Sequence, residues 1–285
     1  MEFINTIKIM KVRFWGTRGS IPSPGKETIK YGGNTTCLEV SLNSGRKIII
    51  DAGSGIRALS QKVISQGITH IDLFLTHSHW DHIQGFPFFA PIYIPNFSMK
   101  IYAASPTFER LPNILEGQMK YIYYPVPFKE IGATIEFGKV KKSGISLDGV
   151  KISSIRTNHP LETHAFKLSE GGKTFVFMTD NELDNPDIAI VPYEELLNFV
   201  KNSDVLVHDA QYTKEEIEQY KGWGHSSWQE TVSFAKKGNV KRLYITHYSP
   251  SRKDEETDKI VERADELGGV GLIVRGAREE EEFEV

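Results

Sequence analysis

Short apolar runs, each ending at a turn-forming segment, recur along the chain and predict a fold rich in β-strands. KVRFWG (11–16), TTCLEVSL (35–42) and KIIID (47–51) are β-rich runs joined by loops rich in glycine, proline and asparagine. SGIRALSQKVISQG (54–67) has apolar positions at helical spacing and a closing glycine, so it predicts a helix. IDLFLT (71–76) predicts a buried strand directly after it.

A second set of strands follows in the other half of the chain. These strands are predicted at 151–157, 164–169, 173–180, 203–210 and 241–247. Four of the apolar runs in the two halves end at a histidine or an aspartate, namely His77, Asp180, Asp209 and His247. Loops at strand ends are where a rigid sheet holds polar chemistry. Four such ends therefore predict one shared site at the edge of a sandwich.

Two segments depart from this pattern. Residues 86–128 hold 11 aromatic side chains in 43 positions, interleaved with prolines. This aromatic-rich insertion is either an extended excursion packed on the core or on a partner subunit, or the wall of a pocket for a flat group such as a base. The C-terminal REEEEFEV (278–285) is an acidic tail, for which the composition predicts a solvated or frayed end.

Length and composition favour a single domain over residues 1–285. Met10 opens MKVRFWG and is a candidate alternative start, which would make residues 1–9 an N-terminal extension. We expect a cytoplasmic protein, because neither a signal peptide nor an apolar run of membrane-spanning length is found. The net charge of −3 provides no global basic field for a long nucleic acid. Cys37 is the single cysteine, which excludes an intrachain disulfide and an all-thiolate zinc site.

The densest chemistry lies in HSHWDH, which holds His77, His79, Asp81 and His82. A turn after the strand lets the imidazoles of His77 and His79 reach one cation, while Asp81 and His82 project toward a second position. Imidazole and carboxylate suit Zn²⁺, and Mn²⁺ or Fe²⁺ are alternatives from ligand type. A solvated polar turn is the competing interpretation, and the deeply apolar strand before it argues against that. Further ligands are available from the strand-end residues His159, Asp180 and His247.

The order of these motifs resembles that of the metallo-β-lactamase superfamily, hydrolases built on an αβ/βα four-layer sandwich. The resemblance covers roughly residues 11–275 and includes an early aspartate, Asp51 in IIIDAGSG. It implies an α/β fold and two divalent metal ions. By the same resemblance, Asp51 orients the ligand loop and Asp180 bridges the two ions. The other implied ligands are His77, His79 and His159 for the first ion, and Asp81, His82 and His247 for the second.

Two further motifs are similar to one branch of that superfamily, which contains tRNase Z and bacterial cyclic-nucleotide phosphodiesterase-like proteins. FWGTRGSIPSPG and YGGNTTCLEV resemble its glycine-rich N-terminal signature. VHDAQYT and GHSSWQE resemble its paired acidic and histidine motifs. This resemblance implies that His225 protonates the leaving oxygen and that Asp209 holds the imidazole of His225 in place. Asp81 is a further catalytic candidate. His225 is also compatible with a helix start in which Ser226 is the N-cap. Two roles are considered for His164, a structural role and contact with the substrate.

The chain departs from tRNase Z between His159 and Asp180. In tRNase Z a long insertion that carries the tRNA-binding arm separates the corresponding residues, whereas 21 positions separate them here. The sequence also reads HDAQ where tRNase Z typically has HEAT. Together with the negative charge, these departures favour a small phosphodiester substrate over tRNA.

We therefore expect a dinuclear metal-dependent phosphodiesterase that hydrolyses a small phosphodiester, such as a cyclic nucleotide, by attack of a metal-bridging hydroxide. The first alternative is a tRNase Z-like tRNA 3′-processing endoribonuclease. A lactone or ester hydrolase and a non-catalytic metal or ligand sensor are further alternatives. No membrane partner is expected, and a homodimer is indicated only by the resemblance and the aromatic-rich insertion.

Overall fold

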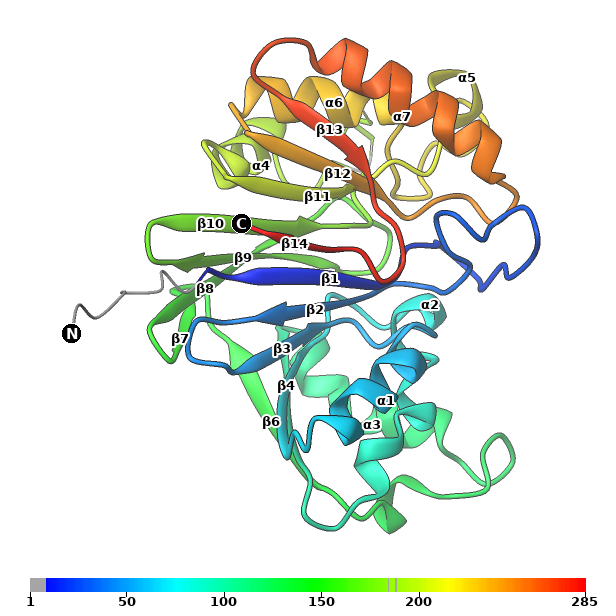
Figure 1. Cartoon of the computed structure of the whole chain (residues 1–285), viewed down its shortest axis with the longest axis vertical. Helices are drawn as coiled ribbons and strands as arrows, with labels where there is room; N and C mark the ends of the chain where they lie inside the picture. Colours follow the sequence, from blue (N-terminus) through cyan, green and yellow to red (C-terminus); the bar gives the residue numbers. More distant parts are fainter. Residues whose placement is uncertain (1–8, 184, 188) are drawn as a thin grey trace, which may run out of the picture.

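Two seven-stranded sheets lie face to face in the computed structural model, which describes residues 9–183, 185–187 and 189–285 (Figure 1). Residues 1–8 of the predicted N-terminal extension lie outside the described residues. The first sheet has the order β14-β1-β2-β3-β4-β5-β6, with β1 (Lys11–Gly16), β2 (Cys37–Ser41), β3 (Lys47–Ile50), β4 (His70–Phe74), β5 (Ser98–Ala104), β6 (Thr134–Val140) and β14 (Glu282–Glu284). The second has the order β13-β12-β11-β10-β9-β8-β7, with β7 (Ile145–Leu147), β8 (Val150–Arg156), β9 (His164–Glu170), β10 (Lys173–Met178), β11 (Val205–Asp209), β12 (Arg242–Thr246) and β13 (Ile273–Gly276).

Helices cover the outer faces of both sheets, which gives four layers (Figure 1). On the first sheet these are α1 (Ile56–Ser65) and α3 (Thr107–Gln118), with the short α2 (Trp80–Ile83) inside the segment that contains HSHWDH. On the second sheet they are α4 (Tyr193–Val200), α6 (Trp228–Lys237) and α7 (Asp254–Gly268), with the short α5 (Lys214–Ile217). The one-turn 3₁₀ helices are η1 (Phe86–Phe88), η2 (Ala90–Tyr93) and η3 (Phe128–Glu130). Among the described residues, no helix combines the length and the apolar character that crossing a membrane requires.

Alternation along the strands sorts their side chains between layers. Phe14 of β1 joins the core between the two sheets, whereas Trp15 joins the core under α1. Ile48 and Ile50 of β3 likewise face the other sheet, and Ile49 faces the helices. Because both faces of these strands are covered, they read as continuous apolar runs in the sequence. The four-layer αβ/βα sandwich expected from the sequence is therefore confirmed.

The topology brings the carboxyl ends of several strands to one edge. β10, β11 and β12 run parallel, and β8 has the same direction because β9 is antiparallel to both β8 and β10. In the first sheet, β3 and β4 are also parallel. The residues that follow these strand ends are those singled out above as candidate ligands. The sheet topology therefore explains why motifs distant in sequence meet at one place.

The interpretation of residues 86–128 as an extended excursion is wrong for much of the segment. β5 lies inside the first sheet, where Ile101 pairs with Leu73 of β4 and with Phe137 of β6. α3 then packs on the outer face of β5 and β6. The sequence analysis missed this strand because it interpreted the many aromatic residues as an irregular excursion. Most of these aromatic side chains pack in the core under the helices. Tyr121 and Tyr123, in the loop after α3, are exposed instead.

The acidic C-terminal segment is also not a frayed tail. β14 pairs antiparallel with β1, and Val12 is the register partner of Phe283. Phe283 and Val285 are buried in the core between the sheets, while the glutamates that alternate with them are exposed. The charge run masked a strand with one solvated face and one buried face.

Candidate metal centre

Three histidines and one aspartate from separate strand ends form the first group of candidate ligands. His77 and His79 follow β4, His159 follows β8, and Asp180 follows β10. Nε2 of His159 lies 3.1 Å from Nδ1 of His79. Oδ2 of Asp180 lies 3.5 Å from Nε2 of His77 and 3.9 Å from Nε2 of His159. The four ligand atoms therefore surround a single point.

A second group lies on the other side of Asp180. It contains Asp81, His82, Asp180 and His247. Nε2 of His82 lies 3.3 Å from Oδ1 of Asp180 and 3.3 Å from Oδ2 of Asp81. Nε2 of His247 lies 3.1 Å from Oδ2 of Asp81 and 3.3 Å from Oδ1 of Asp180. Asp180 thus turns one carboxylate oxygen to each group, an arrangement that allows a carboxylate to bridge two cations.

The donor sets and spacings fit divalent cations. Ligand atoms at about 2.0–2.1 Å from a tetrahedral Zn²⁺ are about 3.3 Å apart, close to the separations in both groups. Nε2 of His77 and Nε2 of His82 are buried and have no hydrogen-bond partner among the described residues. An uncompensated buried polar atom is costly, and a cation would compensate both nitrogens. The two groups therefore have the composition and the spacing of metal-ion sites.

Sharp turns after the strands aim these side chains inward. Asp51, Asp180 and His247 have positive φ values of 62°, 55° and 60°. This left-handed conformation is uncommon outside glycine, although aspartate and histidine are enriched in it. Each of the three residues comes directly after a strand or one residue later. The local strain lies at residues of the candidate metal centre and at Asp51, which supports it.

Hydrogen bonds to the outer nitrogens hold the imidazoles in place. His82 Nδ1 donates to Asp51 at 2.8 Å, and His159 Nδ1 donates to the Gly224 carbonyl at 3.1 Å. His247 Nδ1 donates to Oε1 of Gln211 at 3.2 Å. Each bond fixes the tautomer that leaves Nε2 facing the centre.

Sequence reasoning identified Asp51 and missed several other supports. Gln211 lies in the HDAQ motif, and its position in that motif was the one available signal. Ser20 donates its backbone N–H to Oδ2 of Asp81 at 2.8 Å. The Ser20 contact comes from the glycine-rich N-terminal loop, and a backbone donor leaves no residue-type signal in a sequence.

His225 lies over the centre, between ligands of the two groups. Its ring centroid is 5.4 Å from that of His159 and 5.0 Å from that of His247. Nδ1 of His225 is 3.5 Å from Oδ2 of Asp209, which is longer than a hydrogen bond. The Asp209 carboxylate instead accepts the backbone N–H groups of Asn181 and Ser226. Asp209 therefore ties the loop after Asp180 to the loop that carries His225.

The helix after His225 begins one residue later than the sequence analysis expected. Ser227, not Ser226, is the N-cap of α6, and it forms a capping box with Glu230. Ser226 is buried, and its hydroxyl donates to the Asn181 carbonyl at 2.6 Å. The prediction failed because both serines are good caps, and the tertiary bond to Asn181 decided between them.

Comparison with known proteins places this geometry in a family. The family described as "Beta-lactamase superfamily domain" matches residues 46–248. The chain belongs to the β-lactamase superfamily. Ribonuclease Z of Archaeoglobus fulgidus (strain ATCC 49558 / DSM 4304 / JCM 9628 / NBRC 100126 / VC-16) is 24% identical over 306 residues, with 90% of this chain and 92% of the relative covered.

Solved structures agree on the fold of this superfamily member. The metallo-β-lactamase fold protein YhfI from Bacillus subtilis matches with a TM-score of 0.71 and 17% identity, covering 97% of this chain and all of that one. Human tRNase Z, short form, matches with a TM-score of 0.66 and 17% identity, covering 96% and 99%. The chain is therefore a metal-dependent hydrolase by family, and its substrate is a separate question.

The electrostatics of this superfamily site differ between the two groups. Burial lowers the pKa of His77 and His79, and brings that of His159 to about 4, so these imidazoles are neutral. Burial also opposes charge on His82 and His247, yet nearby carboxylates, Asp180 first among them, raise the pKa of both. The carboxylates of the second group therefore attract positive charge, as a cation site requires.

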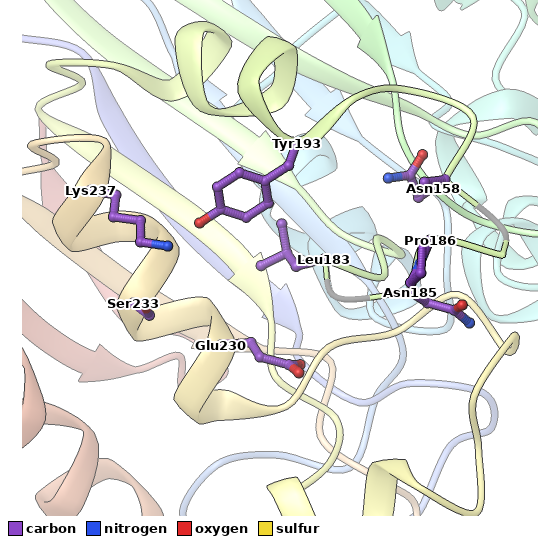
Figure 2. Close-up of a pocket in the computed structure, with 9 residues that line it drawn as sticks. Asn158, Leu183, Asn185, Pro186, Tyr193, Glu230, Ser233 and Lys237 are labelled. Atoms are coloured by element: carbon purple, nitrogen blue, oxygen red, sulfur yellow. The ribbon is translucent and has the colours of Figure 1, made fainter.

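A cavity of about 530 Å³ lies next to the His159 loop of this superfamily member, between the start of α4 and the exposed face of α6 (Figure 2). Figure 2 shows Tyr193 and Lys237 on one side, and the Lys237 ammonium is 5.1 Å from the Tyr193 ring centroid. Asn158 lies on the opposite side. Its Oδ1 accepts the backbone N–H groups of Ile190 and Val191 at 2.9 and 2.8 Å. Asn158 thus positions the loop beside His159.

Proposed function

We propose that this protein is a phosphodiesterase that uses two divalent metal ions to hydrolyse a small phosphodiester, such as a cyclic nucleotide. One observation carries the proposal: His225 stands over the point where the two ligand groups meet, between His159 and His247. A proton donor at that place can protonate a poor leaving group as it departs. An alkoxide released from a phosphodiester is such a group.

The side chains that we propose as ligands belong to the two groups described above, one group for each ion. His77, His79 and His159 would hold the first ion, Asp81, His82 and His247 the second, and Asp180 both. Their imidazole and carboxylate donors favour Zn²⁺, with Mn²⁺ or Fe²⁺ as alternatives. Bound there, the ions would supply an activated water and stabilise charge on the phosphoryl oxygens.

The chain's own residues then account for the leaving group. As the new P–O bond forms with the water oxygen, the P–O bond to the 3′ oxygen breaks. His225 gives its proton to the departing oxygen, which leaves as an alcohol. Asp209 holds the loop of His225 through the Ser226 N–H at 3.0 Å. Its Oδ2 atom lies 3.5 Å from Nδ1 of His225.

The short connection between His159 and Asp180 supports a small substrate. β9 and β10 form a simple antiparallel hairpin closed by Gly171 and Gly172. In tRNase Z, by the resemblance stated above, this interval carries the tRNA-binding arm. The net charge of −3 also offers no general attraction to a polynucleotide.

Ribonuclease Z activity is the second candidate, because relatives with that name match along most of the chain. The Archaeoglobus protein covers 90% of it at 24% identity, and the Ribonuclease Z of Clostridium perfringens (strain ATCC 13124 / DSM 756 / JCM 1290 / NCIMB 6125 / NCTC 8237 / Type A) covers 86% at 26%. This candidate requires the same ions and the same acid. The two candidates differ only in how the rest of an RNA would be held. The homodimer and the cytoplasmic location stay predictions from the sequence.

The test is metal analysis followed by turnover of three substrates: bis-p-nitrophenyl phosphate, cyclic AMP, and a precursor tRNA with a 3′ trailer. We expect about two ions per chain and turnover of both small diesters. His225→Ala should slow cyclic AMP hydrolysis by about 10²–10⁴-fold. It should slow p-nitrophenolate release far less, because that leaving group needs no proton.

Each alternative has its own outcome in this experiment. Cleavage of the precursor tRNA without cyclic AMP turnover would select Ribonuclease Z activity. Equal effects of His225→Ala on both leaving groups would remove the acid assignment. Metal binding without phosphodiester turnover would remove the proposed function, and a following assay with lactones would separate an ester hydrolase from a sensor.

A further inference from the structure

A second cavity, of about 670 Å³, opens between the two sheets, and the proposed reaction does not use it. One wall comes from the end of β6 and the residues after it, and the opposite wall from β8 and β9. Lys141 and Lys142 lie on the first wall, and Arg156 and His164 lie on the second. Arg156 and His164 are register partners, so their side chains emerge side by side.

Two nitrogens of the second wall lack partners. Nδ1 of His164 and Nε of Arg156 are buried and make no hydrogen bond to any described residue. His164 is only 9% exposed, so water gives it little compensation. The backbone N–H of His164 is already used, since it donates to the Thr76 carbonyl at 3.1 Å. Both free side-chain nitrogens can donate a hydrogen bond, so the wall calls for an acceptor.

The charge of the cavity has the sign that suits an anion. Its lining holds four cationic side chains and two carboxylates, on a chain that is negative as a whole. Glu162 is 3.6 Å from Nη1 of Arg156 and 3.8 Å from Nε2 of His164, so it leaves the two unpartnered nitrogens uncompensated. Lys139 pairs with Glu109 at 2.6 Å. Lys141 and Lys142 are exposed and have no ion-pair partner among the described residues.

We propose that this cavity binds a phosphate group, held by Arg156 and His164 at its base and by Lys141 and Lys142 at its rim. Phosphate offers several acceptor oxygens to donors from two walls, and arginine with lysine is the usual pair that recognises it. Burial, with help from Arg156, lowers the pKa of His164 to about 4. The imidazole is therefore neutral and can donate from Nδ1 without adding charge.

The cavity is linked to the metal centre by short stretches of chain. Thr76, which accepts the His164 N–H, directly precedes His77. Arg156 is three residues before His159, and the hydroxyl of Thr157 donates to the Asp180 carbonyl at 2.8 Å. The phosphate could therefore belong to a substrate that carries a second phosphate, or to a separate phosphorylated ligand. The binding site itself does not depend on the proposed function.

Histidine side-chain NMR on the full-length, metal-loaded protein tests this site directly. Inorganic phosphate is titrated at constant pH and ionic strength, with chloride as the reference anion, and the nitrogen signals of the nine histidines are followed. His164→Gln assigns the signal of His164. We expect a saturable shift of that signal with phosphate and none with chloride. Lys141→Gln with Lys142→Gln should weaken the apparent affinity at least tenfold.

Lys120→Gln with Lys201→Gln is the matched control, since both lysines are exposed, form no ion pair with any described residue and lie outside the cavity. The control should leave the phosphate affinity unchanged. An unmoved His164 signal, or equal weakening in both double variants, would overturn the proposal. Measuring KM of the Lys141→Gln, Lys142→Gln variant for diesters with and without a second phosphate separates a substrate phosphate from a separate phosphorylated ligand. A rise in KM confined to the diester with a second phosphate assigns the site to the substrate. An unchanged KM for both diesters assigns it to a separate ligand.

Discussion

Oδ2 of Asp51 lies 2.8 Å from Nδ1 of His82, and both side chains are fully buried. The other oxygen of Asp51 accepts the backbone N–H of Thr76 at 2.8 Å, so the carboxylate cannot rotate away. Asp51 therefore holds a proton on Nδ1 of His82, and Nε2 is the atom that faces Asp81 and Asp180 and is available to a cation. A single buried carboxylate thus sets the protonation pattern of a candidate metal ligand.

Asp51→Asn should weaken the second metal position. The amide keeps the shape of the carboxylate, but with its oxygen kept on Thr76 it turns an NH₂ group toward His82. That reverses the tautomer and places a proton on Nε2. We expect about a 10- to 100-fold loss of affinity for one of two ions, measured by metal titration with mass-spectrometric metal counting. Two ions bound at wild-type affinity would show that Asp51 does not act through His82.

Gly224→Ala should disturb His159 through a steric contact. Gly224 has a φ of +85°, and a Cβ there would overlap the His159 ring and Cδ of Pro160. The ring cannot yield without losing its bond to the Gly224 carbonyl. We expect loss of one bound ion and a fall in any hydrolytic activity of at least tenfold.

Gly222→Ala provides the matched control for that substitution. Gly222 has nearly the same φ, +86°, and a Cβ there would meet nothing within 4 Å. Both variants carry a backbone penalty of about 1 kcal/mol, but only Gly224→Ala adds the clash with His159. Equal metal content in the two variants would show that the contact with His159 is unimportant.

Glu39→Gln should lower stability in a pH-dependent way. Glu39 is buried, yet it contacts Lys62 at 2.8 Å and Lys47 at 3.1 Å, and it accepts the Trp15 indole N–H. Burial alone would raise the pKa of Glu39, but the lysines outweigh it and lower the pKa below its ordinary 4.5. A carboxylate with a depressed folded-state pKa stabilises the fold above its unfolded pKa and loses that contribution as pH falls through the folded pKa.

We expect Glu39→Gln to cost about 1–3 kcal/mol at pH 7, and the difference from wild type to shrink below about pH 4.5. Urea unfolding at several pH values measures it. Glu136→Gln is the control, because Glu136 is 64% exposed and its pair with Lys100 should contribute little. A difference for Glu39→Gln that is constant down to pH 3 would contradict the ion-pair explanation.

The elements and candidate ligands that form contiguous patterns in the sequence could be predicted from it. β1 matches the prediction at 11–16, and the helix predicted at 54–67 appears as α1. HSHWDH and the other candidate ligands could be grouped because each of them lies at or shortly after the end of a predicted strand. The structure brings all seven together, although the sequence contained no distance between them. Strand ends carry this information because sheet topology places them at one edge.

The parts that escaped prediction depend on tertiary contacts. The Ser20 contact with Asp81 requires two loops that are 61 positions apart to meet, and its donor is a backbone N–H. β5 was hidden by aromatic residues that read as an irregular excursion. β14 was missed because the five glutamates of residues 278–285 dominated the interpretation, although a period of two was still present at Phe283 and Val285. Composition outweighed periodicity in both errors.

Phe283→Ala should reveal how much the misjudged C-terminal segment contributes to the fold. The Phe283 ring stacks on Tyr244 at a centroid distance of 4.3 Å and packs 5.7 Å from Phe14. Because it is buried between the two sheets, its removal leaves a cavity there, with an expected cost of about 3–5 kcal/mol. Thermal and urea unfolding measure this loss.

Phe88→Ala is the control at a phenylalanine that is 56% exposed, and it should change stability far less. If the two variants lost the same stability, β14 would be a peripheral strand whose packing contributes little. We expect the opposite, since Phe283 spans from the last strand of the chain to the strands of both sheets.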